Sequence, residues 1–167
     1  MEPLVDCVIE DARWDALGLQ PLAGRAVSAA MSLVGLPEHG FTLCLLGCDD
    51  ARISVLNAEF RGKSLPTNVL SWPSETLSEG TPGVVPALPL AGTPDAPWSL
   101  GDIAISFDTC QREAEAAGKL MADHVTHLVV HGFLHLLGYD HIRDADATLM
   151  EQREVAILAT LGVDDPY

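Results

Sequence analysis

The sequence predicts one domain of the α/β (α+β) class, in which helices pack on a mixed sheet of about four strands. Three observations support this. Strand-like apolar runs alternate along the chain with segments whose apolar residues recur at helical spacing. The 167 residues, 48% of them hydrophobic, suffice for one packed core and argue against disorder. Neither an internal repeat nor a second domain is evident, so we expect one domain over residues 1–167.

Four short apolar segments are expected to form the strands. The third is bounded by Pro66 and Pro73, and the second carries Cys44 and Cys48, which we interpret as small core thiols. Residues 74–99 contain five prolines and three glycines, so they are expected to form an irregular loop. The expected strands are residues 3–10, 41–47, 67–72 and 100–106.

Five segments have the pattern of helices. Helix caps are expected at Asp49 or Asp50 for the second, at Asp108 or Thr109 for the third, and at Asp144 or Asp146 for the last. Glycines close several of these segments. The expected helices are residues 20–36, 51–62, 110–119, 122–138 and 144–162.

Charge and hydropathy exclude several classes of protein. Nine basic residues against twenty-four acidic residues give a net charge of −15, which argues against a broad basic surface for DNA or RNA. A local exception lies in residues 51–74, which contain three basic residues and one acidic residue, a local charge of +2. They are Arg52, Arg61, Lys63 and Glu59. No apolar run reaches eighteen residues, and the first residues lack the pattern of a signal peptide, so we expect no membrane association and a cytoplasmic location.

Five of the six histidines lie between residues 124 and 141. On a helix over 122–138, His131 and His135 are four residues apart, so their side chains lie on one face. The other residues of this helix are mostly apolar, which predicts that it is buried. Buried imidazoles need hydrogen-bond partners or a metal ion. Three histidines satisfied without metal are the alternative. We expect His124 and His127, on the same face, to pack or to lie behind the ligands.

A turn at Gly138 can bring His141 back to the two helical histidines. Three imidazoles leave one tetrahedral position open, which is the arrangement of catalytic zinc. The spacing H-x3-H-x5-H matches the ligand skeleton of metzincin proteases, but Gly132 stands where those enzymes have the glutamate base. We therefore expect one divalent ion, with zinc favoured and nickel, copper or iron also suited to imidazole ligands.

The segment "HLVVHGFLHLLGYDH" resembles the signature of the YbeY family of bacterial rRNA maturation factors, which are single-strand-specific metallo-endoribonucleases. The segments "LNAEFRGKSLPTNVLSWP", "GDIAIS" and "LMEQREVAILATLGVDDPY" also resemble that family. The resemblance implies metal ligands at His131, His135 and His141, a functional arginine at Arg61, and a metal at the base of a cleft in a small α/β domain. Trp72, Ser64 and the long 74–99 loop depart from the family pattern.

The resemblance implies cleavage of ribosomal RNA, including maturation of the 3′ end of small-subunit rRNA, and ribosome quality control. The implied partners are rRNA, the small ribosomal subunit and assembly factors, without DNA. Arg61 would offer a planar fork to phosphate oxygens, and Lys63 could add a contact. Asp140, Asn68 and Ser71 are further candidates for the cleft, whereas Tyr139 is expected to pack. Two alternatives are a metallopeptidase and a non-catalytic assembly factor with a structural metal.

Overall fold

The computed structural model describes residues 4–77 and 80–167, which form four strands and six helices. The strands are β1 (Val5–Ile9), β2 (Phe41–Cys48), β3 (Val69–Pro73) and β4 (Trp98–Ser106). The helices are α1 (Ala12–Leu17), α2 (Leu19–Val34), α3 (Asp50–Arg61), α4 (Phe107–Ala117), α5 (Met121–Leu136) and α6 (Asp144–Thr160). Residue 3 of the first expected strand and residues 78–79 of the expected loop lie outside the described residues.

The four strands form one mixed sheet in the order β1-β2-β4-β3. β2 pairs in parallel with β1 and with β4, while β3 pairs antiparallel with β4. In this register Ile103 of β4 lies between Leu45 of β2 and Ser71 of β3. The predicted α/β class and the mixed four-stranded sheet are confirmed.

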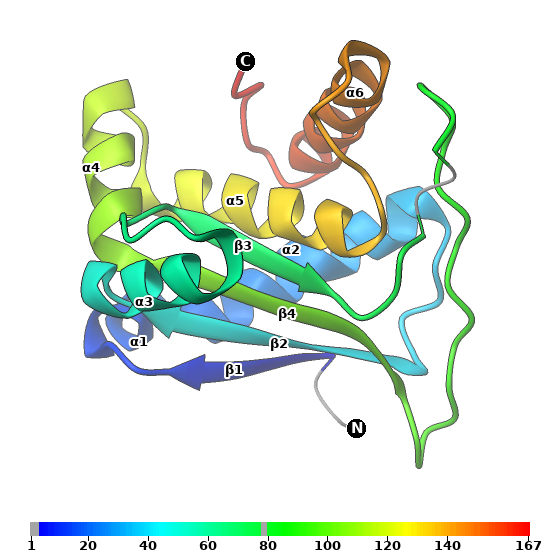
Figure 1. Cartoon of the computed structure of the whole chain (residues 1–167), viewed down its shortest axis with the longest axis horizontal. Helices are drawn as coiled ribbons and strands as arrows, with labels where there is room; N and C mark the ends of the chain where they lie inside the picture. The colour runs from blue at the N-terminus through cyan, green and yellow to red at the C-terminus, as the bar shows by residue number, and fades with distance from the viewer. Residues whose placement is uncertain (1–3, 78–79) are drawn as a thin grey trace.

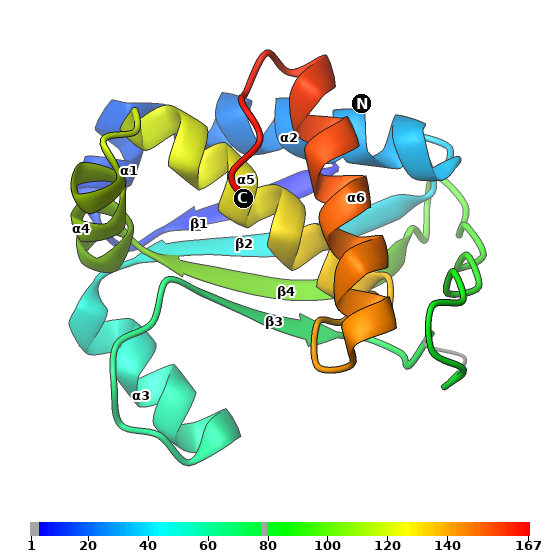
Figure 2. The same ribbon diagram turned by 90° about the horizontal axis from the view of Figure 1, so that it is seen from above.

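Helices lie on both sides of this sheet. In Figure 1, α5 lies above the sheet with α6 above it, and α2 passes behind the strands; Figure 2 shows α3 beyond the β3 edge of the sheet. Figure 2 shows α6 crossing over α5. The main core fills the space between the sheet, α2, α5 and α6, whereas Ile53 and Leu56 of α3 pack in a smaller core against Leu70 and Trp72. α5 is buried along most of its length, as its apolar sequence predicts.

Of the three side-chain caps expected from the sequence, the structure confirms the one of α3. Asp49 caps α3, and its side chain accepts a hydrogen bond from the amide of Arg52. α4 begins at Phe107 with Ser106 in the cap position, so the expected start at Asp108 or Thr109 is wrong. The physical reason is that Asp108 is used elsewhere, as the acceptor of the Asp50 amide 3.0 Å away.

The expected side-chain cap of α6 is also wrong. Arg143 occupies the cap position without a side-chain hydrogen bond. Asp146 instead accepts a hydrogen bond from the amide of Gly83, 2.9 Å away in the proline-rich segment. The carboxylate therefore ties this segment to α6 rather than satisfying the amides of its own helix.

The described residues between Pro73 and Trp98 contain no helix or strand. Besides the contact with α6, the amide of Gly92 donates to the carbonyl oxygen of Gly40, 2.8 Å away, in the turn before β2. The segment thus runs from the end of β3 past α6 to the turn before β2, which lies at the same end of the sheet. Across residues 4–77 and 80–167, no helix has the length and apolar character needed to span a membrane.

Candidate metal centre

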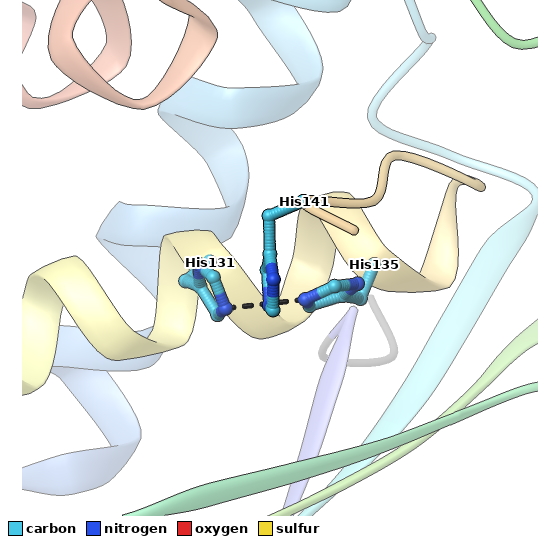
Figure 3. Close-up of side chains that lie close together, drawn as sticks. All are labelled: His131, His135 and His141. Atoms are coloured by element: carbon cyan, nitrogen blue, oxygen red, sulfur yellow. Dashed lines mark hydrogen bonds between the residues drawn. The ribbon is translucent and has the colours of Figure 1, made fainter. Parts of the chain in front are cut away.

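Helix α5 presents His131 and His135 on one face, one turn apart. Their Nε2 atoms lie 3.1 Å from each other, and both rings are partly buried. Figure 3 shows the two rings on α5 pointing toward a common point, with the ring of His141 between them. The sequence spacing therefore brings these two side chains together as expected.

A glycine turn returns the third histidine to this point. Gly138 has a φ of 96°, which is the left-handed conformation that glycine adopts without strain. The amide of Tyr139, a buried residue, donates to the carbonyl oxygen of Leu134, and Asp140 Oδ1 accepts from the amide of His141 at 2.7 Å. Tyr139 therefore packs, and Asp140 stabilises the turn that positions His141.

The three histidines form a group that fits a divalent ion. Their ligand nitrogens all lie within 4.8 Å of one another, and no fourth His, Cys, Asp or Glu among the described residues joins this group. Two nitrogens bound tetrahedrally at zinc distances would be about 3.3 Å apart, close to the separation of the His131 and His135 nitrogens. Burial, followed by the neighbouring His131 and His141, lowers the pKa of His135 to about 4. The neutral ring keeps a lone pair for a ligand.

Sequence reasoning missed Glu154 of α6, which lies behind this group. Its side chain is fully buried, and its carboxylate contacts His131 Nδ1, His127 Nε2 and the Tyr167 hydroxyl. Burial alone would raise the pKa of Glu154, but the hydrogen bonds from His127, His131 and Tyr167 outweigh it and hold the pKa at about 2. One signal in the sequence could have found it, because Glu154 is four residues after Met150 and four before Leu158 and therefore falls on the apolar face of α6.

The remaining two histidines of α5 lie outside the three-histidine group. His124 Nε2 is 3.0 Å from Glu113 Oε1, and His127 Nε2 is 3.2 Å from Glu154 Oε2. Glu113 also accepts from Asn68 Nδ2 at 3.0 Å, so Asn68 is directed away from the candidate centre. These side chains therefore support the packing of α5 rather than the pocket.

A pocket of about 210 Å³ opens beside His135. Arg61, at the last turn of α3, lines it together with Ser71 of β3, and two carboxylates, Glu75 and Asp140, complete its polar wall. Arg61 is exposed and makes no salt bridge with the described residues, in contrast to Arg13, Arg52, Arg112 and Arg143. The guanidinium is therefore available to an anion that enters the pocket. Lys63 does not line it.

The position of the missing protease base is closed by packing. Gly132 is buried, and its carbonyl oxygen accepts a hydrogen bond from Ser71 Oγ at 3.3 Å. A Cβ atom at this position would meet Ile103 Cγ2 and Ser71 Oγ at 3.2 Å. A glutamate has no room here, so the site lacks the general base that a peptidase of the metzincin type requires.

Three imidazoles without a fourth protein ligand among the described residues, at the edge of a pocket that offers an arginine, are the ligand set typical of a hydrolytic metalloenzyme. Residues 8–162 match the family model described as Endoribonuclease YbeY, and the chain belongs to this family.

Curated relatives agree with the family assignment. The chain is 62% identical over 165 residues to "Endoribonuclease YbeY" of Ruegeria pomeroyi, covering 98% of this chain and 97% of the relative. It is 59% identical over 167 residues to the protein of the same name from Cereibacter sphaeroides, covering 100% of both chains. The solution structure of TM1509 from Thermotoga maritima shares the fold, with a TM-score of 0.59 at 19% identity over 92% of this chain and 86% of that one.

Proposed function

We propose that this chain is a metal-dependent endoribonuclease that cleaves single-stranded RNA at the pocket between α3 and α5. The observation that carries the proposal is that Arg61 and His135 line the same pocket, with His131 and His141 directly beside it. Anion recognition and a candidate metal centre therefore meet within one small volume, as phosphodiester hydrolysis requires.

The chain's own residues divide the work in this proposal. A divalent ion held by His131, His135 and His141 supplies a Lewis acid for a phosphate oxygen and lowers the pKa of water. Arg61 binds the phosphate with its planar fork and stabilises the negative charge that develops during cleavage. The pocket edge, built from Ser71 and residues 75–77, limits how the RNA strand enters the pocket.

Glu75 is the better placed of the two pocket carboxylates to accept the proton of the attacking water. Oδ1 of Asp140 accepts the amide hydrogen of His141, whereas Glu75, which lines the same pocket, is exposed and makes no hydrogen bond or salt bridge with the described residues. Glu75→Gln should lower the cleavage rate by about 10²–10⁴-fold without changing metal content. A rate within a factor of two of wild type would exclude this role.

Four further assignments belong to the same proposal. Zinc is the expected ion, with nickel as the alternative. The substrate is ribosomal RNA, including the 3′ end of small-subunit rRNA, so the partners are the small subunit and its assembly factors in the cytoplasm. Processing of this RNA also serves ribosome quality control. Residues 1–167 act as one domain, with the proline-rich segment at the edge of the site.

The test is a cleavage assay with RNA and protein substrates. Metal-loaded protein is incubated with a single-stranded rRNA fragment, with the same fragment annealed to its complement, and with casein. We expect cleavage of the single strand alone, lost in His135→Ala and retained in His39→Ala, whose histidine is exposed outside the site. Cleavage of casein would favour the peptidase. Cleavage of neither RNA nor casein, with one bound ion, would favour the non-catalytic assembly factor.

A further inference from the structure

Glu154 places a buried negative charge against the back of the three-histidine group. It extends from α6, which packs across α5, and its side chain is fully buried. One carboxylate oxygen contacts Nδ1 of His131, while the other lies 3.2 Å from Nε2 of His127 and accepts a hydrogen bond from Tyr167. Both oxygens are thus occupied by donors from α5 and from the segment after α6.

The contact with His131 decides which nitrogen of that ring carries the proton. A carboxylate oxygen of Glu154 contacts Nδ1 of His131, so this ring nitrogen is the one that donates to Glu154. The lone pair is then on Nε2, which is the atom 3.1 Å from Nε2 of His135. Hydrogen bonding at one ring nitrogen therefore directs the other nitrogen to the candidate metal centre.

We infer that Glu154 is a positioning residue of this centre, which fixes the tautomer and the rotation of the His131 ring, and that His127 and Tyr167 hold Glu154 in place. This role rests on the proposed metal-dependent function and adds to the site three residues that do not line its pocket. Glu154 also connects the segment after α6 to the metal centre, because the Tyr167 hydroxyl donates to the same carboxylate as His127.

The same contacts allow two competing roles for Glu154. It can serve only to join α5 and α6, in which case its loss changes stability but not metal affinity. His127, His131 and Glu154 can also hold a second ion, since their ligand atoms lie within 4.8 Å of one another. The positioning role is favoured because each Glu154 oxygen already has a hydrogen-bond donor, so the carboxylate is satisfied without an ion.

The experiment measures metal affinity separately from folding. Glu154→Gln, Glu154→Ala, Tyr167→Phe and the control Glu151→Gln, an exposed residue of the same helix, are titrated with zinc against a chromophoric chelator. Thermal unfolding is recorded without metal, and cobalt(II) replaces zinc to give a visible spectrum of the centre.

We expect one ion per chain in wild type. Affinity should fall by about 10-fold in Glu154→Gln, whose amide oxygen still accepts from Nδ1, and by about 100-fold in Glu154→Ala. The zinc affinity of Tyr167→Phe should fall by less than about 10-fold, and that of Glu151→Gln should match wild type. The cobalt spectrum should shift in Glu154→Gln, because the charge behind His131 changes. If Glu154→Ala does not fold, Glu154→Gln decides.

Three outcomes overturn the inference. Zinc affinity of Glu154→Gln equal to wild type, with an unchanged cobalt spectrum, would show that Glu154 only joins the helices. Two ions per wild-type chain, with one lost in the Glu154 variants, would make it a ligand. Wild-type protein that binds no divalent ion would remove the proposed function itself, a result distinguishable from the first two.

Discussion

Nε2 of His131 and Nε2 of His135 lie 3.1 Å apart on successive turns of α5. Two polar nitrogens this close on a mostly buried helix share either a proton or an ion. The third ring lies within reach, with centroid distances of 5.3 Å from His141 to His131 and 4.9 Å from His141 to His135. One ion satisfies all three rings at once, whereas one proton serves only two of them.

Replacing any of the three histidines should therefore remove the metal. His131→Ala, His135→Ala and His141→Ala, purified without chelator, should each carry less than about a tenth of the ion of wild type, because losing a ligand costs more than the 10–100-fold typical of residues behind the ligands. Elemental analysis measures this. His39→Ala is the control and should keep one ion per chain. Full metal content in all three variants would refute the proposal that these histidines bind the ion.

Arg61→Ala should lose activity without losing metal. Arg61 lines the pocket but is not in the three-histidine group. Removing a donor that stabilises developing charge typically costs about 10²–10³-fold in rate. Arg61→Lys should recover only part of this, because an ammonium lacks the planar fork. Arg25→Ala, an exposed arginine of α2, is the matched control for charge. Single-turnover cleavage rates measure the effect. Equal rates for Arg61→Ala and Arg25→Ala would contradict the role of Arg61 in cleavage.

Gly132→Ala should destabilise the fold although alanine favours helices. The gain in helix propensity is about 1 kcal/mol. Against it, the new methyl group meets Ile103, which is 1% exposed and packed in the core, and overpacking typically costs about 1–3 kcal/mol. Urea unfolding should show a net loss of about 1 kcal/mol. Gly24→Ala in α2, where a Cβ meets nothing within 4 Å, should instead be neutral or stabilising.

Asp50→Asn should change how stability depends on pH. Burial acts to raise the pKa of Asp50, but hydrogen bonds from Thr109, Ser106 and Arg112 outweigh it and lower the pKa. The stability that the ionised group contributes is present above the unfolded pKa, about 3.9, and is lost as the pH falls through the lower folded pKa.

The Asn variant should therefore be less stable than wild type by about 1–3 kcal/mol at pH 7. The gap should close as the pH falls below about 4. Thermal unfolding from neutral to acidic pH measures the difference, with Asp95→Asn in the exposed loop as control. A gap that stays constant across this range would show that Asp50 acts by shape rather than by charge.

RNA binding should depend weakly on salt. The chain has a net charge of −15, and Arg61 is the one basic residue that lines the described pocket, with Lys63 two residues further along. Two phosphate contacts on a single strand give a slope of about −1.4 for log K against log salt concentration. Metal-free protein with fluorescent single-stranded RNA provides the measurement, and Lys63→Ala should reduce the slope by about 0.7. A slope steeper than about −4 would mean that a larger basic surface exists.

Much of the fold is predictable from local patterns. The strands are short apolar runs bounded by proline and glycine, and α5 is apolar except for its histidines, so their types are evident before any contact is known. The sequence does not predict α1, because six residues give too little periodicity. Its stability comes from Trp14, which is fully buried and donates to the carbonyl oxygen of Cys48 at 2.9 Å.

The sequence by itself determined the candidate ligands, because helical spacing fixes the shared face of His131 and His135 and a glycine turn limits where His141 can lie. Only the tertiary structure decided what surrounds them. Glu154 reaches His131 because burial of apolar surface packs α6 across α5, and Arg61 reaches the pocket because α3 ends beside it. These pairings depend on long-range packing of whole elements, and no local spacing encodes them.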